Sequence, residues 1–200
     1  MQDTPASHSR QDTPPEFERL AAIAEPFLRR LYFVAILTKY LGESAGPVIV
    51  GEHAVEYYTL GQYATGDLDL VCSRRAELDR LLSSWGFVRE GRHWRNDALR
   101  LYVEAPAEAL QRAEAARVVE GQIEGLPAFI IGPEDLIVDR LNAYVHWRYS
   151  DDGFWAQQII RSLGKGLDWE YLQRRCQEES TLAALEEIRK QWEAEGGREG

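Results

Sequence analysis

Asp67 and Asp69 are the residues of this sequence whose types and spacing most directly suggest chemistry. They lie in the segment TGDLDLV, where Leu68 and Leu70 alternate with the acids. Successive side chains of a β-strand point to opposite faces, so both carboxylates would share one face. Neighbouring carboxylates repel each other, and a divalent cation bound by their oxygens relieves the repulsion. The spacing therefore indicates a metal site, and the plain alternative is an ordinary solvated carboxylate on an amphipathic strand.

The residues before and after this pair predict the elements that must position it. An apolar run at 48–50 is typical of a buried strand ending at Gly51, and a helix is expected over roughly 52–60. After the strand at 68–71, Ser73 is expected to cap a helix that runs to Trp85. Three short strands, at 87–90, 92–96 and 99–104, then predict a meander that carries Glu104.

The remainder of the chain is predicted to be helical at both ends. Helical periodicity covers 17–41, with a break at Pro26, and a short helical piece is expected near 107–115. Apolar positions between 118 and 131 indicate further strand. Four more helices are expected to start at Pro133, Ser150, Asp168 and Thr181.

This pattern predicts an α+β fold: a small mixed β-sheet flanked by helices, with an N-terminal helix and a C-terminal helical segment. We expect a disordered tail at 1–15, an α/β core at 16–132, a helical segment at 133–192 and a flexible tail at 193–200. The tails are expected to be frayed because they carry too little apolar surface to order themselves.

Composition restricts the classes of partner. A formal net charge of −10 opposes non-specific binding to DNA or to anionic lipid, because such binding depends on lysine and arginine neutralising phosphate. No 18-residue apolar run and no apolar signal-peptide core are present, so we expect no membrane span and a cytoplasmic location. Cys72 and Cys176 are expected to be reduced, since two cysteines form no disulfide framework.

Gly51 followed by Asp67 and Asp69 resembles the DNA polymerase β-like nucleotidyltransferase superfamily. Within it, the chain is similar to minimal bacterial nucleotidyltransferase-like proteins related to AbiEii-type toxins. The resemblance covers roughly 48–160 and rests on GEHAVEYYTLGQYATGDLDLV, on the later acidic strand LYVEAP, and on IIGPEDLIVDRLNAYVHWRYSDDGFWAQQI. The core at 16–132 would then be nucleotidyltransferase-like.

The resemblance implies a role for several residues. Asp67, Asp69 and Glu104 would be the catalytic carboxylates and would bind Mg²⁺, since three hard oxygen donors suit that ion. Backbone N–H groups following Gly51, at the start of a helix, would bind phosphate oxygens of a nucleoside triphosphate. Arg140 is a second phosphate-binding candidate.

Glu52 departs from the superfamily pattern, which commonly has glycine or serine after the first glycine. A carboxylate at this place would repel a triphosphate, although Glu52 still belongs to the predicted nucleotide-binding segment.

The function implied is transfer of a nucleoside monophosphate from an NTP to a hydroxyl of RNA, protein or a small molecule, by two-metal catalysis. The acceptor could be tRNA or a protein. The alternative is a catalytically inactive binding module of the same fold, belonging to a toxin–antitoxin or phage-defence pair, with a cognate antitoxin as its partner. Glu52 favours the alternative, and the intact acidic pair favours the enzyme.

Several other residues have plain interpretations. His53 lies beside the expected phosphate turn, but a lone histidine is more often a packing or surface residue. Trp147 and Tyr149 are expected to pack between helices rather than stack on bases. Arg92 and Trp94 are expected to share one face of a solvated hairpin, although a nucleic-acid contact there is the alternative.

Overall fold

A computed structural model describes residues 13–197. The predicted disordered tail at 1–15 falls mostly outside this range. Of the flexible tail predicted at 193–200, residues 193–197 are described, and helix α9 extends into it as far as Ala194. Within residues 13–197, no helix combines the length and the hydropathy needed to cross a lipid bilayer.

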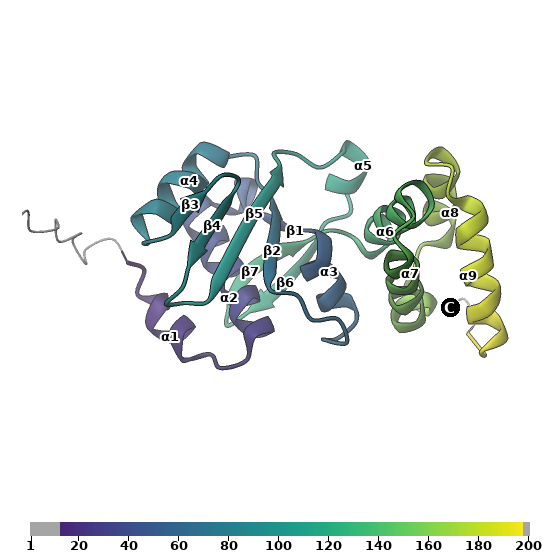
Figure 1. Ribbon diagram of the computed structural model, residues 1–200, viewed down its shortest axis with the longest axis horizontal. Coiled ribbons are helices and arrows are strands. Elements are labelled where there is room, and N and C mark those ends of the chain that lie inside the picture. The colour runs from purple at the N-terminus through teal and green to yellow at the C-terminus, as the bar shows by residue number, and fades with distance from the viewer. Residues whose placement is uncertain (1–12, 198–200) are drawn as a thin grey trace, which may run out of the picture.

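The described part of the chain contains a mixed sheet of seven strands in the order β3-β4-β5-β2-β1-β7-β6 (Figure 1). Strands β2 and β5 are parallel, as are β1 and β7, and the other neighbours are antiparallel. The strands are β1 (Val48–Ile49), β2 (Asp67–Val71), β3 (Val88–Glu90), β4 (His93–Asn96), β5 (Leu101–Ala107), β6 (Val119–Ile123) and β7 (Leu126–Ile130). This arrangement places the acidic strand β2 at the centre of the sheet.

The helices are α1 (Glu16–Ala22), α2 (Pro26–Leu41), α3 (Gly51–Tyr58), α4 (Arg75–Ser84), α5 (Arg112–Ala115), α6 (Pro133–Trp147), α7 (Ser150–Leu163), α8 (Trp169–Glu178) and α9 (Leu182–Ala194), with short 3₁₀ turns at Glu43–Ala45 and Gly164–Gly166. The α+β fold class predicted from the sequence is therefore confirmed. The division of the chain at residue 132 stays a prediction.

One face of the sheet is buried under helices. Leu68 and Leu70 of β2 are fully buried, as is Trp94 of β4, whose indole N–H donates to Asp79 on α4 at 2.7 Å. Phe33 of α2 stacks on Phe87, with ring centroids 5.2 Å apart. Burial of these large side chains supplies most of the driving force for folding. The opposite face of β2 and β5 carries polar residues, and it is called the polar face below.

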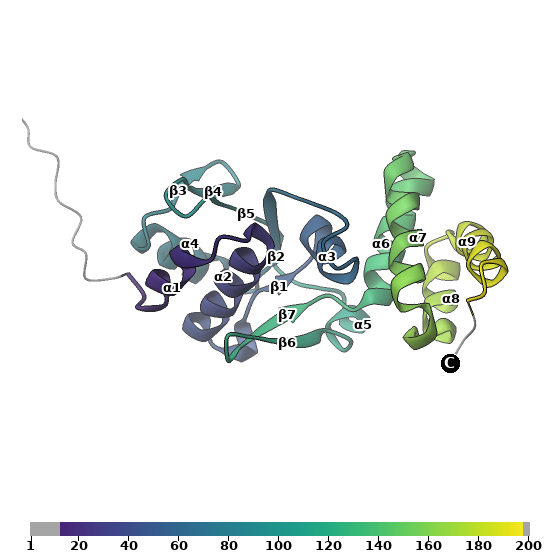
Figure 2. The same ribbon diagram turned by 90° about the horizontal axis from the view of Figure 1, so that it is seen from below.

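The C-terminal helices lie at one end of the molecule, beside α3, and α1 lies at the other end (Figures 1 and 2). Only Ile131 and Gly132 separate β7 from α6. A side chain at Gly132 would come within 2.8 Å of the carbonyl oxygen of Arg117, so this junction is closely packed. Arg117 also contacts Asp168 at 3.1 Å and lies over the ring of Tyr171, 4.0 Å from its centroid. The helical segment is thereby bound to the sheet through several contacts.

Four local predictions differ from the structure. Neither Ser73 nor Thr181 caps a helix with its side chain; Arg74 occupies the position before α4, and it makes no side-chain cap either. Strand β5 extends into the segment expected to be helical, which leaves only Arg112–Ala115 as helix. Trp94 is buried rather than solvated, because the hairpin packs on α4. By contrast, Asp168 does cap α8 by accepting from the Tyr171 backbone N–H at 3.0 Å.

A buried ionic cluster joins α2 to α3. Arg30 donates to Glu56 at 2.6 Å, and His53 Nδ1 lies 3.1 Å from the same carboxylate oxygen. The three side chains are 7% exposed or less. Burial lowers the pKa of His53, more than its contact with Glu56 raises it. His53 is thus a neutral packing residue at neutral pH. The cluster attaches α3 to α2.

Arg30→Met is expected to lower the free energy of unfolding by about 3 kcal/mol or more, because it leaves the Glu56 carboxylate buried without its cation. The double variant Arg30→Met/Glu56→Leu should recover most of that loss. Arg19→Met is the matched control, since the exposed Arg19–Glu124 pair contributes about 1 kcal/mol or less. Urea denaturation measures all three, and equal losses for Arg30→Met and Arg19→Met would contradict the assignment.

Candidate functional site

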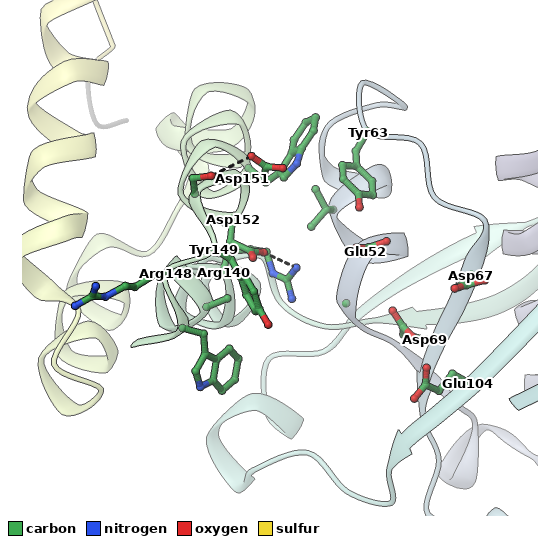
Figure 3. Close-up of a pocket in the computed structure, with 16 residues that line it drawn as sticks. Glu52, Tyr63, Asp67, Asp69, Glu104, Arg140, Arg148, Tyr149, Asp151 and Asp152 are labelled. Atoms are coloured by element: carbon green, nitrogen blue, oxygen red, sulfur yellow. Dashed lines mark hydrogen bonds and ion pairs between the residues drawn. The ribbon is translucent and has the colours of Figure 1, made fainter. Parts of the chain in front are cut away.

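A cleft of about 680 Å³ lies between the polar face of the sheet and the C-terminal helices (Figure 3). Its lining includes all six residues that the sequence predicted for the site: Gly51, Glu52, Asp67, Asp69, Glu104 and Arg140. The sheet, α3 and α6 each contribute to it. The cleft is therefore the place in the described structure where the predicted residues are brought together.

Gly51 and Asp69 make the closest approach at this site. Gly51 begins α3 with a φ of 58°, a conformation that favours glycine. Any side chain there would also collide with the Asp69 carboxylate. The backbone N–H of Glu52 donates to that carboxylate, and the Val50 N–H donates to the Asp69 carbonyl at 3.0 Å. The first turn of α3 is thus packed directly on the acidic strand.

Strand register places the acids in rows. Asp69 pairs with Glu104 across the parallel strands β2 and β5, and Glu104 pairs with His93 across β5 and β4. Asp67 belongs to the next row on the same face, opposite Tyr102. Side chains of paired residues lie on the same face of a sheet. The two aspartates and Glu104 therefore share the polar face, as the alternation in the sequence predicted.

The Asp69 carboxyl has a perturbed pKa. Burial and the neighbouring carboxylates of Glu104, Glu52 and Asp67 raise the pKa of Asp69 to about 6, although the hydrogen bond from the Glu52 N–H acts in the opposite direction. Such crowding of negative charge is the electrostatic environment in which a bound cation is most strongly attracted.

Glu104 contacts two side chains of the hairpin. Arg92 Nε lies 2.8 Å from one carboxylate oxygen, and His93 Nδ1 lies 3.4 Å from the other. The Glu104 side chain is only 14% exposed. No local pattern in the sequence indicates this pairing. Arg92 was expected to share a face with Trp94, but it lies in the turn between β3 and β4 and reaches the opposite face.

Among residues 13–197, no three histidine, cysteine, aspartate or glutamate side chains are already grouped closely enough to hold a metal ion. The predicted ligands Asp67, Asp69 and Glu104 fit Mg²⁺ in the chemistry of their donor atoms and in the face they share. A three-carboxylate site would, however, require Glu104 to exchange its present partners for a cation.

Glu52 directs its carboxylate at the loop that precedes β2. It accepts a hydrogen bond from the Thr65 hydroxyl at 3.1 Å and from the hydroxyl of Tyr63. Burial and this hydrogen bond raise the pKa of Tyr63. Figure 3 shows Glu52 between Tyr63 and the acidic strand. Its carboxylate therefore organises the cleft wall while adding negative charge beside the start of α3.

Arg140 already has two carboxylate partners. Its guanidinium donates to Asp139 at 2.6 Å and to Asp152 at 2.8 Å, and its side chain is 17% exposed. Burial acts against the charged form, but the two aspartates outweigh it and raise the pKa of Arg140. Its phosphate-binding role stays a prediction, and Arg140 would bring little unneutralised charge to a phosphate.

The far wall of the cleft is aromatic, which the sequence interpretation missed. Trp147 and Tyr149 line the cleft and are 63% and 61% exposed, so they are not the helix-packing residues that were expected. They flank Arg148, which ends α6 in the left-handed conformation with a φ of 59°. The run of aromatic residues at the end of a predicted helix was the available signal. A positive φ at a non-glycine residue ends the helix and turns this segment toward the cleft.

Neither a protein-family model nor a curated protein matches the sequence. Two solved structures are similar to the fold. The antibiotic-resistance factor ANT(2'')-Ia has a TM-score of 0.53 at 19% sequence identity, over 82% of this chain and 97% of that one. An antigenic nucleotidyltransferase-like protein from Paracoccidioides brasiliensis has a TM-score of 0.51 at 15% identity, over 80% of this chain and 94% of that one. The chain therefore has a nucleotidyltransferase-like fold.

Proposed function

We propose that this protein transfers a nucleoside monophosphate from an NTP to a hydroxyl group of an RNA, protein or small-molecule acceptor. The observation that carries the proposal is the pairing of Asp69 with Glu104 on adjacent parallel strands, inside a cleft and beside the start of α3. Asp67 adds a third carboxylate on the same face. The nucleotidyltransferase-like fold supports the same reaction class.

In this reaction the acceptor oxygen forms a bond to the α-phosphorus, the bond from that phosphorus to the bridging oxygen breaks, and pyrophosphate leaves. The acceptor hydroxyl gives its proton to solvent. Asp67, Asp69 and Glu104 would hold Mg²⁺, and Gly51 lets the backbone approach the acids closely. When bound, Mg²⁺ would supply charge neutralisation at the phosphates and a lower pKa for the acceptor hydroxyl.

The cleft walls would position the two substrates. Trp147 and Tyr149 offer exposed aromatic surface across the cleft from the acids, suited to stacking on a planar base or on an acceptor ring. On the side of the sheet, the Glu52 carboxylate accepts a hydrogen bond from Thr65 and so holds the loop that precedes β2 in place. Catalysis would then rest on positioning and on electrostatic stabilisation, as in other phosphoryl and nucleotidyl transfers.

The second candidate is a catalytically inactive nucleotidyltransferase-fold module that binds a partner, as one half of a toxin–antitoxin or phage-defence pair related to AbiEii-type toxins. Two observations favour it. Glu52 adds negative charge where a triphosphate would approach, and Glu104 is paired with Arg92 and His93. In that case the partner would be a cognate antitoxin protein rather than a nucleotide.

Asp67→Asn and Asp69→Asn are each expected to reduce nucleotidyl transfer at least a hundredfold, because each removes a charged ligand of the proposed cation. The measurement is transfer from α-labelled NTPs, with Mg²⁺, onto total tRNA and onto cell extract. Asp97→Asn serves as control, since the Asp97 side chain is 69% exposed and its one ion pair among the described residues is with Arg95 on the hairpin. Equal labelling by all variants would reject the catalytic proposal in favour of the binding module.

The raised pKa of Asp69 predicts a pH-dependent gain in stability for Asp69→Asn. The unfolded carboxyl ionises near its ordinary pKa of about 3.9, whereas the folded one ionises near 6, so its charge destabilises the metal-free fold increasingly between these pH values. Without Mg²⁺, Asp69→Asn should be more stable than wild type by about 1 kcal/mol at pH 7, after allowance for partial exposure. The difference should vanish near pH 4 in urea denaturation, and a constant difference would contradict the assignment.

Glu52→Gln is expected to strengthen NTP binding a few-fold, because it removes a negative charge beside the phosphate site while the amide oxygen can still accept from Thr65. Calorimetric titration with each NTP and Mg²⁺ measures this. Glu43→Gln provides a control of equal charge change outside the cleft. Unchanged affinity would show that Glu52 does not face the bound triphosphate.

A further inference from the structure

Both carboxylate oxygens of Glu104 are occupied in this structure. Arg92 Nε contacts Oε1 at 2.8 Å, and His93 Nδ1 contacts Oε2 at 3.4 Å. A divalent cation bound by the same oxygens must therefore compete with these donors. Arg92 carries a full positive charge at any physiological pH, so its contact is the stronger competitor.

Arg92 is placed so that it can leave Glu104. It lies in the turn between β3 and β4, outside either strand, and its side chain is 70% exposed. Glu104, in contrast, lies within β5 and is hydrogen-bonded on both sides through β2 and β4. The arginine is the exposed member of the pair and the glutamate belongs to a strand paired on both sides, so we expect a competing cation to displace Arg92 rather than Glu104.

The cleft also needs a cation for the triphosphate. The Glu52 N–H at the start of α3 is already bound by Asp69, and Arg140 is neutralised by Asp139 and Asp152. Neither group offers an unneutralised positive charge. Arg148 also lines the cleft, but it lies on the helical side and its side chain is directed away from the acids (Figure 3). Arg92 reaches the cleft through its contact with Glu104, which lines it. A guanidinium released there would be free to bind phosphate oxygens in a bidentate manner.

We propose that Arg92 is an exchangeable counter-ion: it neutralises Glu104 when the site holds no metal, and it transfers to the NTP phosphates when Mg²⁺ binds Glu104. This inference rests on the proposed function. It assigns Arg92 two opposite effects, since the same side chain opposes binding of the metal alone and supports binding of the metal–nucleotide complex.

The experiment measures Mn²⁺ affinity by electron paramagnetic resonance, without nucleotide and with α,β-methylene analogues of the four NTPs. Arg92→Gln should bind Mn²⁺ alone about fivefold more tightly than wild type, the factor expected from removing one partly exposed ion pair. With an analogue present, the same variant should bind the complex at least about fivefold more weakly. In the double variant Arg92→Gln/Glu104→Gln, the tighter binding of Mn²⁺ alone should disappear.

Arg95→Gln is the matched control. Arg95 lies on β4 of the same hairpin and pairs with Glu90 and Asp97 rather than with Glu104. It tests whether removing a positive charge from the hairpin is enough to produce either shift, and it should leave both affinities near those of wild type.

The outcomes separate this inference from the proposed function. Opposite shifts in Arg92→Gln alone support the exchange, as does Mn²⁺ binding that is detectable only in that variant. If wild type binds Mn²⁺ and an analogue and Arg92→Gln matches it, or weakens both, the exchange is rejected and the proposed function stands. If neither wild type nor Arg92→Gln binds Mn²⁺, the exchange and the proposed function are both rejected.

Discussion

The contact of Asp69 with the first turn of α3 is the constraint on which the site depends. The carboxylate lies against the backbone of Gly51 and accepts from the N–H of Glu52, so strand β2 and helix α3 meet without an intervening side chain. Helix α3 is also attached to α2 through the buried Arg30–Glu56 ion pair, so both contacts position the start of α3 beside the acids. The Asp69–Gly51 contact and the Arg30–Glu56 ion pair therefore set where α3 meets the acidic strand in the cleft.

Negative charge at this place has a cost that the fold offsets locally. Arg140 is held between Asp139 and Asp152 on the helical side, and Glu104 is held by Arg92 on the sheet side. Asp69 has no cationic partner in the described structure and instead has a raised pKa. Asp67 and Glu52, which line the same cleft, also have no ion pair among the described residues, so uncompensated negative charge gathers beside the acidic strand.

Much of the fold could be predicted from sequence because its signals are local. The alternation in DLDLV, the glycine after the apolar run and the helical period after Pro133 each depend on neighbouring residues, and the corresponding elements are present. Contacts between distant segments could not be predicted in the same way. Arg30 and Glu56 are 26 residues apart, and the Arg92–Glu104 pair depends on a register that no local pattern specifies.

The errors have physical causes too. Trp94 looked solvated because charged residues flank it, yet strand alternation sends it to the buried face and its flanking residues to the other. Trp147 and Tyr149 looked like helix-packing residues because large aromatics usually are. The left-handed residue between them turns the chain out of the helix, and both rings line the cleft instead.

The short junction at Gly132 has a consequence for how such a site could diversify. The carboxylates belong to the sheet, whereas the aromatic wall belongs to the helices that follow this junction. A different angle at this junction would change the width of the cleft while Asp67, Asp69 and Glu104 kept their places on the sheet. The width of the cleft and the arrangement of the carboxylates on the sheet are therefore separable properties in this architecture, so that one can change while the other stays intact.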